Sequence, residues 1–182
     1  FWTALVLFFF YCESKEKVKK DLDPADLDLI ISSVERDGRD MMEEIAFVSE
    51  FIISLYENQD TVDYGVPLNY TFTNGISNNR PGDSEDKSTI YISSLQTDQE
   101  LIEKEIRITN PLDSLFRSIR TKYPQIAQIY TNSAEQISRV YPEYDAVNLL
   151  EPDLDLTAFN FYYGADETNN PERVPRWLPD AY

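Results

Sequence analysis

The sequence contains no histidine and only one cysteine, Cys12, among its 182 residues. Histidine is the commonest general base and a usual zinc ligand, so serine–histidine triads are excluded and zinc sites lose their usual ligand. A single cysteine can form no disulfide within the chain. The five glycines form no phosphate-cradling loop and no GxSxG elbow. We therefore expect no catalytic site, cofactor or metal in this chain, so any catalytic domain would lie outside it.

Basic residues are also scarce. The chain has 16 lysines and arginines but 33 aspartates and glutamates, which gives a net charge of −17. Phosphate binding needs clustered lysine and arginine, so we expect no nucleic-acid partner. The hydrophobic fraction of 42% is enough for a core, and the length suits one ordinary domain. An acidic cluster at Glu151, Asp153 and Asp155 lacks the glycine and the spacing of a calcium loop.

The first segment, 1–12, reads FWTALVLFFFYC and is uncharged and apolar. It is shorter than the roughly 20 residues that a transmembrane helix needs, and it does not begin with methionine, so we expect a further piece upstream. We predict a membrane anchor or signal segment, either the tail of a transmembrane helix or a signal peptide with Cys12 as a lipidation site. Tyr11, before the cysteine, is larger than that motif prefers. A buried core strand is the third interpretation.

The segment 24–58 is predicted to form one long helix. Asp23 is a good N-cap, and Pro24 suits the first helical position. Apolar residues then recur in steps of four and three, which is the heptad period. They are Leu27, Ile31, Val34, Met41, Ile45, Val48, Ile52 and Leu55. We interpret 13–58 as a juxtamembrane stalk, whose helix packs either on its own domain or on a second copy as a homodimer.

The remainder, 59–182, is predicted to form a mixed globular domain. The expected elements are strands at 68–73 and 89–93, helices at 98–106 and 112–123, and strands at 125–131 and 135–141. The last two strands are expected to form an antiparallel hairpin that turns at 132–135. Antiparallel strands beside segregated helices predict the α+β class.

Three stretches that follow the long helix resemble bacterial Cache sensor domains. They read ITNPLDSLFRSI, QIYTNSAEQISRVYPEYD and LDLTAFNFYYGADETNNPERVPRWLPDAY, and the resemblance is most specific over 125–182. Cache domains are extracytoplasmic, PAS-like modules of histidine kinases, chemoreceptors and cyclases. The resemblance implies a curved antiparallel PAS-like sheet with the long helix packed along it, and further sheet strands that would follow Tyr182. This sequence departs from the family's Arg-x-Trp-Tyr pattern, because Arg176 directly precedes Trp177.

The resemblance also implies a small-molecule pocket between the sheet and the aromatic segment near the end of the chain. The expected ligand-binding residues are Arg173, Trp177, Tyr163, Tyr182, Tyr130 and Asp166. An arginine fork fits a carboxylate, and an aromatic face beside a carboxylate suits an ammonium group. One alternative stays open: the aromatic rings fill the core, and Arg173 forms a structural ion pair with Asp166 or Glu167.

Two functions follow from this sequence. The first is an extracytoplasmic input domain of a bacterial signal-transduction protein, anchored in the cell envelope and facing the periplasm, that binds an amino acid, an amine or a small carboxylate. The second is a structural or adhesive surface lipoprotein whose heptad helix dimerises. The first requires a ligand pocket, and the second requires none.

Overall fold

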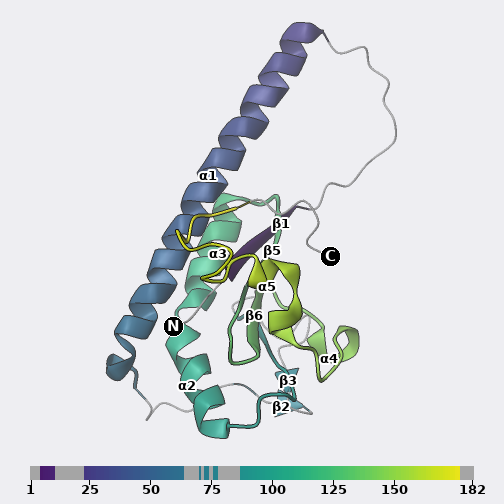
Figure 1. Cartoon of the computed structure of the whole chain (residues 1–182). Coiled ribbons are helices and arrows are strands. Elements are labelled where there is room, and N and C mark those ends of the chain that lie inside the picture. Colours follow the sequence, from purple (N-terminus) through teal and green to yellow (C-terminus); the bar gives the residue numbers. More distant parts are fainter. Residues whose placement is uncertain are drawn as a thin grey trace.

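The computed structural model describes residues 5–10, 23–63, 70, 72–73, 76–77 and 87–176 (Figure 1). Its elements are β1 (Leu5–Phe10), α1 (Pro24–Glu57), η1 (Gln59–Thr61), β2 (Phe72–Thr73), β3 (Ile76–Ser77), β4 (Thr89–Ile92), α2 (Gln99–Thr109), α3 (Leu112–Lys122), β5 (Ile126–Asn132), β6 (Ile137–Tyr141), α4 (Ala146–Leu149), η2 (Leu156–Ala158) and α5 (Asn160–Tyr163). Helices and antiparallel strands are both present and segregated, which confirms the α+β class.

The long helix α1 forms where the capping signals predict it. The Asp23 carboxylate accepts a hydrogen bond from the backbone N–H of Ala25 at 3.0 Å, and Pro24 occupies the first turn. At the other end, the backbone N–H of Asn58 still donates to the carbonyl of Ser54, and the helix ends there because Asn58 has a φ of −103° and a ψ of 20°. The predicted helix at 24–58 is therefore confirmed to within one residue.

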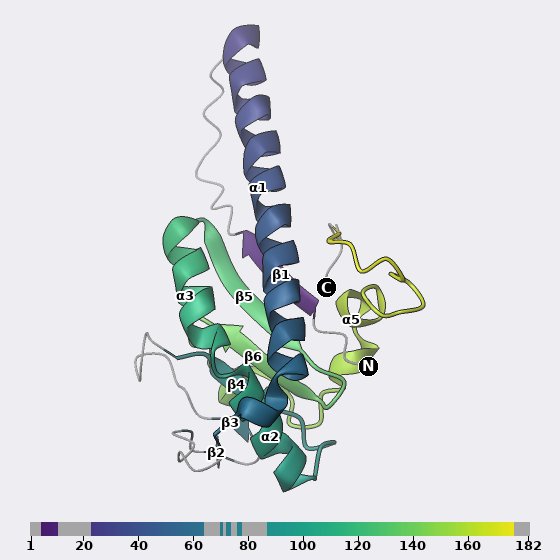
Figure 2. The ribbon, with the colours of Figure 1, turned by 90° about the vertical axis from the view of Figure 1, so that its left-hand side faces the viewer.

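The two halves of α1 have different surroundings. In the second half Met41, Val48 and Ile52 are buried. In the first half the heptad positions Leu27 and Ile31 are each nearly half exposed, and other apolar side chains there are also exposed. Figure 2 shows this first half extending beyond the rest of the molecule. The second half therefore packs on its own domain, while packing of the first half on a second copy stays a prediction.

The main sheet has four strands in the order β1-β5-β6-β4, all antiparallel to their neighbours. The hairpin of β5 and β6 is confirmed, with Tyr130 opposite Val140 and Thr131 opposite Arg139. Strand β6 begins two residues later than predicted. The reason is the turn, in which Gln136 takes a φ of 61°, a left-handed conformation that cannot continue a strand.

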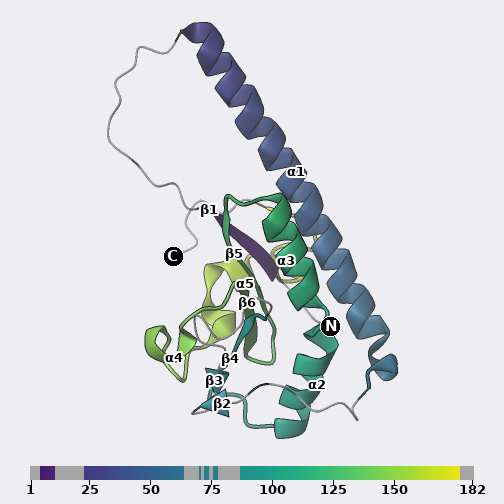
Figure 3. The ribbon, with the colours of Figure 1, turned by 180° about the vertical axis from the view of Figure 1, so that it is seen from behind.

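Successive residues of these strands point to opposite faces of the sheet. We call one side the helix face, because its side chains pack in core clusters with α1, α2 and α3. The helix-face residues are Ile90, Ile92, Ile129, Ile137, Arg139 and Tyr141. We call the other side the aromatic face; it carries Tyr91, Tyr130 and Val140 and is covered by α4, η2 and α5 (Figures 1 and 3).

Two side chains of β4 anchor the segment that crosses the aromatic face. Tyr91 is fully buried, and its hydroxyl donates to the carbonyl of Glu151 at 2.7 Å and accepts from the N–H of Leu154. The Thr89 hydroxyl bonds both backbone groups of Tyr144, at 2.7 and 3.0 Å. Buried hydroxyls that bond a loop backbone stabilise it without a ladder of strand hydrogen bonds.

The apolar segment near the start of the chain contributes a strand. Leu5–Phe10 forms β1 and pairs with β5 along the edge of the sheet, so this part of the segment is a strand, as in the third interpretation, in an edge position. Cys12, the predicted lipidation site, lies outside the described residues. Within the part of the chain that the structure describes, no helix is both long enough and apolar enough to cross a bilayer. The anchor therefore stays a prediction.

Three smaller differences from the sequence analysis have local causes. Helix α2 continues to Thr109, whose hydroxyl donates to the carbonyl of Glu105 within the last turn. The strand predicted at 68–73 is described only at Phe72–Thr73, where it pairs with the unpredicted β3. The irregular segment 142–155 includes a single helical turn, α4.

The two environments along α1 yield a matched test. Ile52→Ala removes a buried side chain from the core between α1, α3 and the sheet, and should lower the free energy of unfolding by about 2–5 kcal/mol. Ile31→Ala, on the same helix but 47% exposed, should change it by less than about 0.5 kcal/mol. Urea unfolding of both variants measures the difference. Equal losses would contradict the description of the first half of α1 as exposed.

Candidate functional site

The aromatic face holds one of the predicted ligand residues in a cluster of rings. Tyr130 of β5 lies beside Val140 of β6 and packs against Phe161 and Tyr162 of α5. The Tyr130 and Phe161 rings meet edge to face with centroids 5.9 Å apart, and Phe159 stacks on Phe161 at 5.0 Å. Both geometries are favourable for aromatic pairs. The structure therefore brings Tyr130 and the aromatic segment into direct contact, which is the packing of the alternative in which the rings fill the core.

The turn at the end of α5 depends on Gly164. The backbone N–H of Gly164 donates to the carbonyl of Asn160 at 2.8 Å. A Cβ atom on Gly164 would lie only 2.6 Å from the same carbonyl oxygen. A side chain would clash with that oxygen, so only glycine lets the backbone pass this close to Asn160 at the end of α5.

Asp166, predicted as a ligand residue, has a local structural role in the next turn. Its Oδ1 accepts hydrogen bonds from the backbone N–H groups of Thr168 and Asn169 at 2.9 and 2.8 Å. It also accepts from the Asn169 side-chain amide at 3.1 Å. A carboxylate oxygen with three donors stabilises the turn that carries Glu167, and this oxygen is not available to a ligand.

Arg173 forms an ion pair with Glu167, which was one of the two partners named in the alternative interpretation. The distance from Nη2 to Oε1 is 2.7 Å, and the two side chains are 48% and 60% exposed. The pair thus lies in solvent and contributes little to stability. Arg173 also has a φ of 53°, an uncommon backbone conformation for a side chain of this size.

The structure places the six predicted ligand residues in three groups. Tyr130 is buried under α5, while Tyr163 is 49% exposed at the end of that helix. Asp166 and Arg173 lie in the following loop, engaged with neighbours in that loop. Trp177 and Tyr182 lie outside the described residues. Tyr163 and Arg173 are thus the two exposed members of the set among the described residues.

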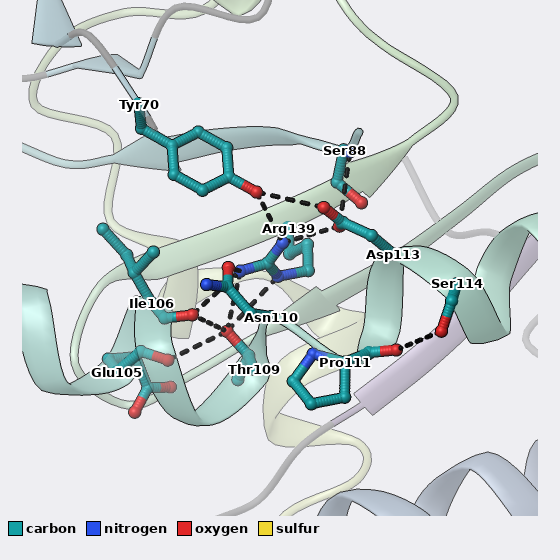
Figure 4. A network of polar contacts seen from close by, with 10 residues as sticks. All are labelled: Tyr70, Ser88, Glu105, Ile106, Thr109, Asn110, Pro111, Asp113, Ser114 and Arg139. Carbon is teal, nitrogen blue, oxygen red and sulfur yellow. Dashed lines mark hydrogen bonds and ion pairs between the residues drawn. The ribbon is translucent and has the colours of Figure 1, made fainter. Parts of the chain in front are cut away.

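A second polar cluster, which the sequence analysis missed, lies on the helix face. Its centre is Arg139 of β6, whose side chain is 2% exposed (Figure 4). One side of the guanidinium meets Asp113 at 2.6 Å and the hydroxyl of Tyr70 at 3.2 Å. The other side donates to the Ile106 carbonyl and the Thr109 hydroxyl, each at 3.1 Å. All three nitrogens are therefore engaged, since Nε also donates to Thr109.

The position of Arg139 between two helix ends explains why a charge can be buried there. Its donors meet the carbonyl end of α2, where helix dipoles concentrate negative charge. Its counter-ion, Asp113, belongs to the first turn of α3, where negative charge is favoured. Burial alone would lower the pKa of Arg139, but Asp113 and Tyr70 outweigh that effect and raise the pKa. The guanidinium therefore stays charged.

One sequence signal could have identified this cluster. In β6 the residues Ile137, Arg139 and Tyr141 share one face, and the first and last are apolar. A charged residue between two inward-facing apolar residues indicates a buried charge with a specific partner. The partner itself was not readable, because Asp113 lies 26 residues earlier and meets Arg139 only through the packing of α3 on the sheet.

Comparison with known proteins identifies no family for this chain. No family model, no curated protein and no solved structure matches it. Among residues 23–63 and 87–176, together with the shorter described pieces, no three acidic or cysteine side chains gather where they could hold a metal ion. A function for the polar cluster around Arg139, or for the cluster on the aromatic face, must therefore be inferred from its geometry.

Arg139→Met tests the structural importance of the buried cluster. Removing the cation leaves Asp113, which is 16% exposed, without its partner, and loss of one member of a buried pair typically costs about 3–5 kcal/mol. We expect a loss of that size in the free energy of unfolding, measured by chemical denaturation. Arg36→Met, at a side chain that is 63% exposed on α1, is the control and should leave the midpoint unchanged. A small effect of Arg139→Met would contradict the role assigned to this ion pair.

Proposed function

We propose that this chain is a Cache-type, PAS-like sensor domain, the extracytoplasmic input part of a bacterial signal-transduction protein. In this proposal the chain binds an amino acid, an amine or a small carboxylate on the aromatic face. The observation that carries the proposal is the contact of Tyr130, on the hairpin strand, with the aromatic segment of α5. That contact joins the two stretches in which the sequence most resembles Cache domains. The proposed PAS-like sheet, with α1 packed along it, corresponds to the strands β4, β5 and β6.

The loop after α5 supplies the polar groups that would select a ligand. Arg173 is held by Glu167 in an exposed pair, which a ligand carboxylate could replace with little loss of stability. Tyr163, half exposed beside this loop, offers an aromatic surface and a hydroxyl. The proposed ligand thus binds between an arginine and tyrosine rings, and its binding releases Glu167 into solvent.

Strand β5 connects the aromatic face to α1, because its side chains pack on both. Ile129 and Tyr130 are consecutive residues of β5 whose side chains point to opposite faces. Ile129 packs in the core cluster that contains Val48 and Ile52 of α1, while Tyr130 packs against Phe161. A ligand that repositions Tyr130 would therefore shift the packing of the helix through a single strand. In this proposal the signal is a shift of α1 between two alternative arrangements.

The binding proposal is tested by the thermal stability of the chain against a panel of amino acids, amines and small carboxylates. A ligand at 100 times its dissociation constant should add about 2.7 kcal/mol, which raises the melting temperature by a few degrees. Arg173→Ala should abolish the increase, and Arg36→Ala, on the remote part of α1, should preserve it. A flat panel on well-folded protein, or the same increase in Arg173→Ala, would speak against a ligand site here.

A second function is favoured by the exposed apolar half of α1. In this alternative the chain is a structural or adhesive surface lipoprotein that dimerises through its heptad helix. Leu27, Ile31 and Val34 continue the row of residues that is buried at Met41 and Val48, yet they are 46%, 47% and 65% exposed. Such a row of exposed apolar side chains is typical of a helix that pairs with another helix.

Sedimentation velocity over a range of protein concentrations tests this pairing. The unmodified chain should form a concentration-dependent dimer, and the double variant Ile31→Ser, Val34→Ser should remain monomeric. Leu29→Ser is the matched control, because Leu29 is 70% exposed but lies off the heptad row, and this variant should still dimerise. A monomer at every concentration in the unmodified chain would remove the support for the alternative.

A further inference from the structure

A carboxyl group is buried where the last turn of α1 meets α2. Glu105 of α2 is 4% exposed, and its Oε1 accepts a hydrogen bond from the hydroxyl of Tyr56 near the end of α1. The two residues are 49 positions apart in the chain, so this bond is a tertiary contact between the two helices. A hydroxyl is a weak partner for a buried carboxylate, because it carries no compensating charge.

The charges around this site do not balance if Glu105 is ionised. The groups that face Glu105 are Tyr56 from α1, Ser133 and Glu135 from the hairpin turn, and Arg139 from β6. Arg139 is the one cation among them, and its direct ion pair is with Asp113 at 2.6 Å. Glu105 is therefore a surplus acidic group, and Glu135 adds a further negative charge nearby.

Water within the site cannot replace the missing counter-ion of an ionised Glu105. A cavity of about 20 Å³ lies beside the carboxyl group, and Tyr56, Thr131, Asn132 and Arg139 are among its lining residues. This volume holds about one water molecule. Asn132 is 2% exposed, and its side-chain nitrogen has no hydrogen-bond partner among the described residues. The cavity thus has polar walls that suit a single water bound between Asn132 and Glu105, far less than the hydration of an exposed carboxylate.

We propose that Glu105 is a buried proton-binding site that holds the last turn of α1 against α2 when it is protonated and weakens that contact when it is ionised. A neutral carboxyl group satisfies Tyr56 without a charge in the interior. Loss of the proton leaves a buried anion that is stabilised only if the helices separate enough to admit water. The inference does not depend on the ligand site proposed above, since none of its groups lies on the aromatic face.

The electrostatics agree with the geometry in direction. Burial raises the pKa of Glu105, the hydrogen bond from Tyr56 lowers it, and the net pKa lies above the ordinary glutamate value. Burial and the nearby Glu105 also raise the pKa of Tyr56, so the phenol stays protonated. Because the folded chain binds the Glu105 proton more tightly than the unfolded chain, this group's stabilisation is complete below the unfolded pKa. It is lost as the pH rises through the folded pKa.

The composition makes this titration unusually easy to isolate. The chain has no histidine, so no side chain with an ordinary pKa titrates between about pH 5.5 and 7.5. Carboxylates with ordinary pKa values have already lost their protons below that range. A change in stability across the window therefore reports a carboxyl group with a raised pKa.

The experiment compares urea unfolding of the 182-residue chain with that of Glu105→Gln from about pH 5.5 to 7.5. In the unmodified chain the unfolding equilibrium constant should rise with pH by up to about tenfold per pH unit while Glu105 titrates. In Glu105→Gln, which stays neutral and retains an acceptor for Tyr56, the rise should disappear. Glu50→Gln, at an exposed position of α1, controls for the change in net charge and should keep the unmodified slope.

Two results would overturn the proposal. One is an unchanged pH slope in Glu105→Gln, even with a uniform loss of stability, because that outcome assigns Glu105 a purely structural hydrogen bond. The other comes from carbon-13 NMR of glutamate carboxyl groups in the unmodified chain, which needs no variant to fold. One resonance should titrate at a higher pH than the others; if all titrate together in the ordinary range near pH 4.3, Glu105 holds its proton no more tightly than an exposed glutamate.

Discussion

The buried guanidinium of Arg139 is the interaction on which the described domain depends. It is the point where β6, the end of α2 and the start of α3 meet, and it also bonds Tyr70 from the preceding loop. A cation is tolerated there because it faces the negative end of one helix dipole and an aspartate in the first turn of the next helix. The network therefore fixes the orientation of α2 and α3 relative to the sheet.

The sheet separates two chemically different halves of the molecule. On its helix face a charged network lies beside a core of isoleucine side chains, including Ile90 and Ile106. On its aromatic face tyrosine and phenylalanine rings fill the space under α5. Because neighbouring residues of β5 serve opposite faces, each strand is shared by both halves. A displacement of the β5 backbone would therefore move side chains on both faces.

The acidic groups Glu105 of α2 and Asp113 of α3 differ because of their partners. Asp113 meets the guanidinium directly and also accepts from the backbone N–H of Ser88, so its charge is compensated. Glu105 lies on the other side of the same arginine but bonds a phenol. One cation cannot neutralise two carboxylates equally, and the closer one is the aspartate. This asymmetry makes a single position of the helix face sensitive to protons.

Periodicity and capping by themselves located the long helix, the two helices that follow it and the central hairpin, but not β3, α4 or α5. The heptad row and Asp23 located α1, and alternation located the β5–β6 hairpin, because these signals are local in the sequence. Only the tertiary structure decided that α1 is buried along one half, that Arg173 pairs with Glu167, and which acid faces Arg139. Those outcomes depend on contacts between residues far apart in the chain, on which local patterns carry no information.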